Sequence, residues 1–77
     1  MAFQDEALAQ RVRHAISQDN RIGGLAIMVR VANGEIALKG RVDTPEQREL
    51  VLLVAQGIPG VRYVSVDELV LKEDSEG

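Results

Sequence analysis

Basic side chains at alternating positions are the residues of this sequence best suited to bind a ligand. Arg30, Lys39 and Arg41 are interleaved with Ala26, Met28 and Ala37. If they share one face of a sheet, that face can bind anionic phospholipid headgroups, with about 1 kcal/mol from each basic residue. Arg62 is expected near the same face. The plainer alternative is an ordinary solvated sheet face, and the residues alone favour it.

A turn with apolar and aromatic neighbours is the second candidate binding surface. Residues 58–61 are Ile-Pro-Gly-Val, with Pro59 at the bend, and Tyr63 follows shortly after. With Leu52 and Leu53, these side chains could enter a membrane interface, where tyrosine is favoured. The alternative is that these side chains pack in the core beside an ordinary turn. The sequence favours this alternative more strongly than it favours the solvated-face alternative for the basic residues.

Catalytic and metal-binding residues are sparse. His14 and Ser17 have helical i, i+3 spacing, but no acid orients the histidine and no oxyanion donor is evident. A single histidine without cysteine does not make a metal site. The acidic residues near the end lack the ligand spacing and glycine of a calcium loop; they are Asp67, Glu68, Glu73, Asp74 and Glu76. We therefore expect no enzymatic activity, no cofactor and no bound metal.

The overall charge narrows the range of partners. Nine basic and twelve acidic residues give a net charge of −3, and the only aromatic residues are one Phe and one Tyr. Nucleic-acid binding usually needs a basic excess and often aromatic stacking platforms, so we expect no nucleic-acid partner. An anionic phospholipid surface and a protein partner remain. Weak self-association is a further candidate, through apolar residues 50–55 or an exposed sheet edge.

The sequence is compatible with more than one cellular compartment. No apolar run approaches the roughly 20 residues that span a bilayer. The first residues lack the basic and apolar regions of a signal peptide. A complete chain would thus be cytoplasmic, whereas a domain excised from an exported protein would be periplasmic or envelope-associated.

A β-hairpin over residues 25–42 must position the basic residues. Asn33-Gly34 predicts a two-residue type I′ turn, because both central residues of that turn need a positive φ. The resulting cross-strand pairs on one face are Val31–Ile36, Val29–Leu38, Ile27–Gly40 and Leu25–Val42. That face is almost wholly apolar, and a slip of one residue would mix the two faces. Gly40 on the apolar face predicts a close approach, which we assign to the second helix crossing the sheet.

Two helices and a third strand complete the chain. Leu8, Val12, Ala15 and Ile16 form one stripe of a helix over residues 5–18. Thr44, Pro45 and Gln47 predict a capped helix that runs to about residue 56. A third strand follows from Val61. Its apolar alternation changes phase at Asp67 and Glu68, so we expect a β-bulge there or a strand end at Val66.

These elements predict an α+β fold of order α-β-β-α-β, with two helices packed on one face of a three-stranded sheet. A right-handed crossover makes strands two and three parallel. If these strands are neighbours the sheet is mixed, which we prefer; if strand three lies beside strand one, the sheet is antiparallel. Residues 1–77 are expected to form one domain, with a core at about 5–71 and a flexible acidic tail at 72–77.

Four segments in order resemble the BON domain family (bacterial OsmY and nodulation). Residues 33–42, Asn-Gly-Glu-Ile-Ala-Leu-Lys-Gly-Arg-Val, resemble its NG-x-V-x-L-x-G-x-V segment. Residues 54–61 resemble its iA-xx-vpGV segment, residues 64–71 its closing strand, and the helix containing Asp5, Leu8, Val12 and Ile16 its opening helix. The resemblance covers about residues 5–71. It departs from the family pattern at Asp67 and Glu68, where Asn is frequent, and in lacking a signal sequence.

The resemblance implies a non-catalytic binding module that associates with phospholipid membranes or with envelope partners. The family has no catalytic motif to transfer. Its glycine and apolar positions correspond to Gly40, Gly60, Leu38, Val61 and Leu69, which are structural positions. A protein-interaction or oligomerisation module, and a small-ligand or cation-sensing accessory domain, remain as alternatives.

Overall fold

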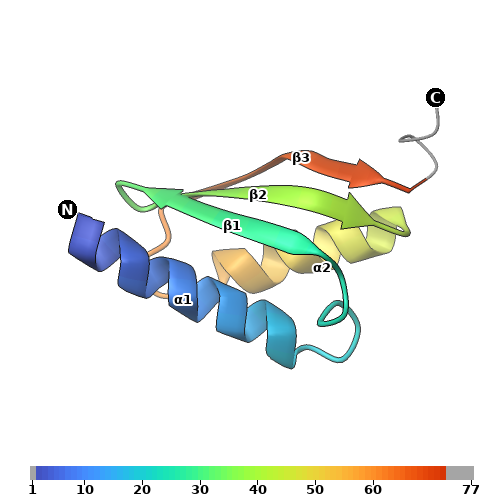
Figure 1. Cartoon of the computed structure of the whole chain (residues 1–77), viewed down its shortest axis with the longest axis horizontal. Coiled ribbons are helices and arrows are strands. Elements are labelled where there is room, and N and C mark those ends of the chain that lie inside the picture. Colours follow the sequence, from blue (N-terminus) through green and yellow to red (C-terminus); the bar gives the residue numbers. More distant parts are fainter. Residues whose placement is uncertain (1, 73–77) are drawn as a thin grey trace.

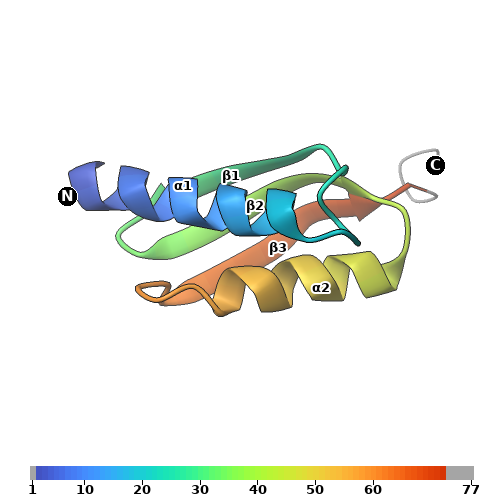
Figure 2. The same ribbon diagram turned by 90° about the horizontal axis from the view of Figure 1, so that it is seen from below.

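The computed structural model describes residues 2–72. The elements follow in the order α1 (Ala2–Gln18), β1 (Ile27–Ala32), β2 (Glu35–Val42), α2 (Pro45–Gln56) and β3 (Tyr63–Leu71). Both helices lie on the same side of the sheet (Figure 1, Figure 2), so within residues 2–72 no helix covers the other side. The predicted acidic tail lies outside the described residues after Lys72.

The three strands form one mixed sheet in the spatial order β1-β2-β3. β1 pairs with β2 in antiparallel orientation, and β2 pairs with β3 in parallel orientation. The parallel pair needs a crossover connection, and α2 supplies it beneath the sheet (Figure 2). The predicted α+β class and the preferred mixed sheet are confirmed.

The hairpin has the register that the sequence predicts. Asn33 and Gly34 have φ values of 56° and 81°, as a type I′ turn requires. The pairs run from Ala32↔Glu35 at the turn to Ile27↔Gly40. Asp5 on α1 secures this turn, because its carboxylate accepts the amide hydrogens of Asn33 at 3.0 Å and Gly34 at 3.4 Å. The start of the chain is thereby joined to the tip of the hairpin.

Gly40 is a point of close approach, but the neighbour is not the one predicted. A Cβ atom at Gly40 would overlap the carbonyl oxygen of Ala26 and lie 3.1 Å from the Cα of Ile27. The chain entering β1 therefore excludes a side chain here, and the assignment to the second helix was wrong. The φ of Gly40 is 151°, which L-residues rarely adopt.

β3 contains the predicted bulge rather than an early end. Ala37 pairs with Ser65 and Lys39 pairs with Glu68, so two residues of β3 lie opposite Leu38. The extra residue reverses the alternation, and Leu69 turns into the core with an exposed fraction of 1%. The strand can thus keep apolar residues on the covered face on both sides of Asp67.

The core is aliphatic and lies between the helices and the sheet. Its fully buried side chains come from α1, β2, α2, β3 and the loop after α1: Val12, Ile22, Ile36, Leu38, Val42, Val51 and Leu69. β1 contributes Val29, which is 8% exposed. Thr44 caps α2 as predicted, with its hydroxyl accepting the amide of Gln47 at 3.2 Å. The Gln47 side chain accepts in return the amide of Asp43 at 2.7 Å, one residue before the cap.

Asp19 and Arg21 organise the loop between α1 and β1. The Asp19 carboxylate accepts the Arg21 amide at 2.8 Å, and the Arg21 guanidinium donates to both carboxylate oxygens at 2.8 and 3.1 Å. The side-chain hydrogen bonds from Arg21, followed by its backbone hydrogen bond, lower the pKa of Asp19 from 3.8 to about 2. These bonds favour the ionised carboxylate.

Replacing Arg21 with alanine is expected to move the pKa of Asp19 upward from about 2, towards 3.8. Because the folded pKa is the lower one, the ion pair stabilises the fold fully above a pH of about 4, and this contribution is lost as the pH falls through about 2. An NMR titration of the Asp19 carboxyl carbon measures the shift. Arg13→Ala, an exposed change on α1, is the control, and an unshifted Asp19 in the unaltered chain would contradict the expectation.

Candidate binding surface

The uncovered side of the sheet is the candidate binding surface, and we call it the open face. It is built from the side chains that alternate with the core residues on all three strands. These are Met28, Arg30 and Ala32 on β1; Glu35, Ala37, Lys39 and Arg41 on β2; and Tyr63, Ser65, Glu68 and Val70 on β3. No helix covers them (Figure 1), so a flat partner can reach all three strands at once.

The three basic residues predicted to act together do share the open face. Arg30 pairs with Ala37, Lys39 lies between Met28 and Glu68, and Arg41 lies beside Val70. All three side chains are exposed.

Two carboxylates also belong to the open face. Glu35 ends the face near the hairpin turn, and Glu68 is the cross-strand neighbour of Lys39. The predicted hairpin register already places Glu35 on this face, and β3 adds Glu68, so the face has mixed charge with a small positive excess. The bulge brings Glu68 to this face, and the sequence signal for it was the change of phase at Asp67.

Exposed apolar side chains accompany the charges. Met28, Tyr63 and Val70 are 60%, 61% and 40% exposed, so each offers apolar surface to a partner. Tyr63 pairs with Glu35, so it lies on the open face at the hairpin end. Sequence reasoning had placed Tyr63 with the Pro59 turn and had missed Val70, because both assignments depend on the register of β3.

Arg62 and Pro59 lie away from the open face. The Arg62 amide donates to the carbonyl of Gly34 at 2.8 Å, and its aliphatic stem packs over Gly34. Both residues line a groove of about 540 Å³ at the hairpin turn, together with Leu8 and Arg11 of α1. Arg62 therefore belongs to the helical side of the hairpin tip, and the expectation that it lies near Arg30 was wrong.

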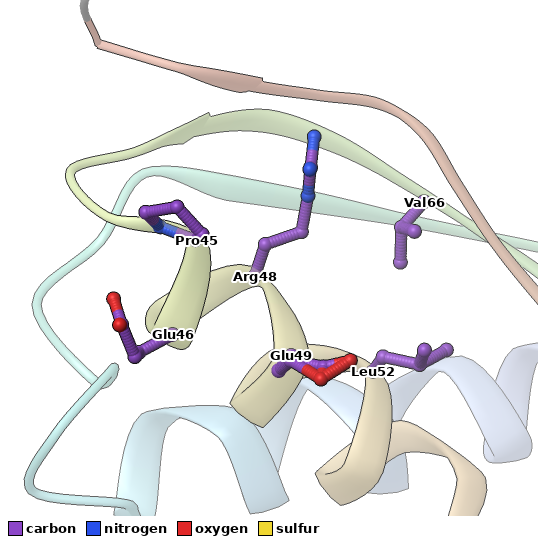
Figure 3. Close-up of a pocket in the computed structure, with 6 residues that line it drawn as sticks. All are labelled: Pro45, Glu46, Arg48, Glu49, Leu52 and Val66. Carbon is purple, nitrogen blue, oxygen red and sulfur yellow. The ribbon is translucent and has the colours of Figure 1, made fainter.

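The apolar residues proposed as a cluster around the Pro59 turn are divided between core and surface, with Leu52, Ile58 and Val61 packed against the core. Leu53 is 61% exposed on α2, whereas Leu52 is half-buried. Leu52 lines a different pocket of about 420 Å³ between α2 and β3, opposite Val66 (Figure 3). In this pocket Arg48 extends from α2 towards the strands (Figure 3).

The chemical groups considered for catalysis do not assemble. The Ser17 hydroxyl donates to the backbone carbonyl of His14 at 2.9 Å, so it does not pair with the imidazole. Within residues 2–72, no three His, Cys, Asp or Glu side chains are grouped closely enough to hold a metal ion. Neither helix in that range combines the length and apolar character needed to cross a bilayer.

The fold defines the class: a small α+β domain with two helices on one side of a three-stranded mixed sheet. The family model of the BON domain matches residues 4–73. The chain belongs to the BON domain family, and the resemblance seen in the sequence is confirmed. Membership supports a non-catalytic, envelope-associated binding module in general. No curated protein matches the chain significantly.

A solved structure supports the fold independently. The C-terminal domain of CdsD, the structural protein of the type III secretion system of Chlamydia trachomatis, superposes with a TM-score of 0.69 at 22% identity. The match covers 87% of this chain and 33% of that one. This chain thus spans about a third of the length of the CdsD structure. At this identity, the likeness concerns the fold alone.

Proposed function

We propose that this BON domain attaches its protein to an anionic phospholipid surface through the open face. The observation that carries the proposal is the exposure of Arg30, Lys39 and Arg41 on one uncovered sheet face. Met28 is the cross-strand neighbour of Lys39, so it presents an apolar side chain beside that cation. A bilayer is flat on the scale of this domain, so all three cations can approach headgroups together.

The electrostatic part of this attachment is expected to be weak. Three basic residues near an anionic surface contribute about 1 kcal/mol each, and the carboxylates of Glu35 and Glu68 offset part of this. The chain also carries a net charge of −3, which opposes approach in other orientations. Binding should therefore be reversible and strongly reduced by salt.

A protein partner is the second candidate, and the mixed charge of the open face favours it. Glu35 and Glu68 beside three cations suit a partner surface with charges of both signs. Exposed Tyr63 and Met28 are residue types enriched at protein interfaces.

Co-sedimentation with vesicles separates the two candidates. The chain is expected to pellet with anionic vesicles at low salt and not with neutral ones. The double change Arg30→Glu and Arg41→Glu should weaken this binding by at least about tenfold. The matched control, Arg11→Glu and Arg13→Glu on exposed positions of α1, alters the net charge equally and should have a much smaller effect.

If both double variants lose vesicle binding equally, net charge alone attracts the chain to the vesicles. This result would reject the proposal that the open face binds the lipid surface. No pelleting of the unaltered chain with any vesicle would reject the membrane proposal and favour a protein partner.

A further inference from the structure

The outer edge of β1 carries backbone groups with no partner in residues 2–72. β1 is an edge strand, since only β2 pairs with it. Ala32 and Glu35 flank a two-residue turn, so they and every second pair along the hairpin exchange hydrogen bonds. The intervening residues Ile27, Val29 and Val31 therefore direct their amide and carbonyl groups outward. In this part of the chain, no turn, loop or side-chain hydrogen bond engages them.

A groove of mixed lining runs beside this edge on the helical side, with Arg13, His14 and Ser17 of α1 as its polar side chains. It has a volume of about 380 Å³ and lies between α1 and β1. Its apolar lining comes from Ile16 of α1, Leu25 before the strand, and Ile27 and Val29 of β1. Leu25 and Ile27 are only half-buried, so additional side chains at the edge could complete their packing.

The two edges of the sheet differ in their protection against pairing. β3 carries a bulge and the exposed acidic residues Asp67 and Glu68, which are features that block edge-to-edge association. β1 is regular throughout its pairing with β2, and its sequence Ile-Met-Val-Arg-Val-Ala contains one charge and no proline. Of the two edges, β1 alone is suited to accept another strand.

We infer that two copies of this chain pair through their β1 edges, antiparallel about a two-fold axis, to form one continuous sheet. The occupant of each edge is a second copy because β1 is its own complement. Its outward groups alternate with a spacing that an antiparallel copy matches. Pairing would place the half-buried apolar side chains of the two β1 strands next to one another on the helical side of the joined sheet. This inference does not depend on the proposed lipid binding.

Charge and the number of paired β1 residues together select the register of the pair. To keep core residues on one face, Ile27, Val29 and Val31 must oppose residues of the same set. Centring the axis on Arg30 would place the two Arg30 side chains directly opposite each other, which is unfavourable. Centring it on Val29 places Arg30 opposite Met28 of the partner subunit and Ile27 opposite the partner's Val31. This register forms about six intersubunit backbone hydrogen bonds.

The Val29-centred register makes a prediction that leaves the monomer intact. Met28 is 60% exposed, so its replacement should leave the core undisturbed. Because Met28 pairs with Lys39 in the same chain, urea unfolding of each variant measures the small cost or gain within the monomer separately. Met28→Arg places like charges opposite Arg30 of the partner subunit twice per dimer and should weaken the dimer by about tenfold. Met28→Glu places opposite charges there and should strengthen it several-fold. Combining Met28→Arg with Arg30→Glu should restore dimerisation.

Sedimentation equilibrium of the 77-residue chain, from micromolar to millimolar concentration, measures the dimer constant. Arg41→Glu on the central strand is the control, since it lies on the same face but away from the edge. In NMR hydrogen exchange, the amides of Ile27, Val29 and Val31 should become protected as concentration rises.

A chain that stays at 8.4 kDa at millimolar concentration would overturn the inference. A dimer that responds equally to Met28→Arg and Met28→Glu, or that leaves the three β1 amides unprotected, would overturn it as well.

Discussion

Replacing Gly40 with alanine is expected to destabilise the domain by about 3 kcal/mol. The added methyl group would overlap the carbonyl oxygen of Ala26, which belongs to the backbone and has little freedom to move. The φ of 151° adds conformational strain for any L-residue. Strain of this kind costs on the order of 1–3 kcal/mol, and overpacking adds a similar amount. The loss is a large fraction of the 4–12 kcal/mol, roughly, expected for a domain of this length.

Urea unfolding followed by far-UV circular dichroism measures this loss, because the sequence has no tryptophan and only one tyrosine for fluorescence. Gly24→Ala is the matched control. A Cβ atom at Gly24 would meet no atom within 4 Å, so the free energy of unfolding should change by no more than about 0.5 kcal/mol. If Gly40→Ala and Gly24→Ala change the free energy of unfolding equally, the contact between Ala26 and Gly40 does not exclude a side chain at position 40.

Shortening Leu69 to alanine should cost about 3 kcal/mol, within the usual range of 2–5 kcal/mol for such a change in a core. Leu69 is 1% exposed and packs in the central cluster with residues of both helices. The bulge in β3 is what places it there, since it reverses the alternation after Ala37↔Ser65. The cost of this change therefore tests the bulge as well as the packing.

The neighbouring change Val70→Ala is the control for Leu69. Val70 is 40% exposed on the open face, so its truncation should cost less than about 1 kcal/mol. If the bulge were absent, the two residues would exchange faces and the order of the two costs would reverse. Comparing the urea midpoints of Leu69→Ala and Val70→Ala decides whether the bulge is present.

The bulge also links the fold to the candidate surface. Without it, one-to-one pairing after Ala37↔Ser65 would place Asp67 beside Lys39 and Leu69 beside Arg41 on the open face. The shift places Glu68 and Val70 there instead. The extra residue in β3 therefore turns Leu69 into the core, while Lys39 keeps an acidic neighbour on the open face. Stability and surface chemistry are set here by the same local feature.

The sequence determined most of the secondary structure, because its signals are local. Asn33-Gly34 requires positive φ values that few other pairs tolerate, and this turn defined the hairpin register. Thr44 and Pro45 marked the start of α2, and the phase change at Asp67 indicated the bulge. The grouping of Arg30, Lys39 and Arg41 followed from period-two alternation alone.

Tertiary structure alone decided which distant segments meet. The contact of Gly40 with the backbone of Ala26, the seating of Arg62 on Gly34 and the carboxylate of Asp5 at the hairpin turn all join residues that local patterns treat separately. The placement of Tyr63 and Glu68 on the open face depends on how β3 pairs with β2 across the α2 crossover. A local pattern sets which residues of one strand share a face, but only packing against the neighbouring strand sets which charges stand beside them.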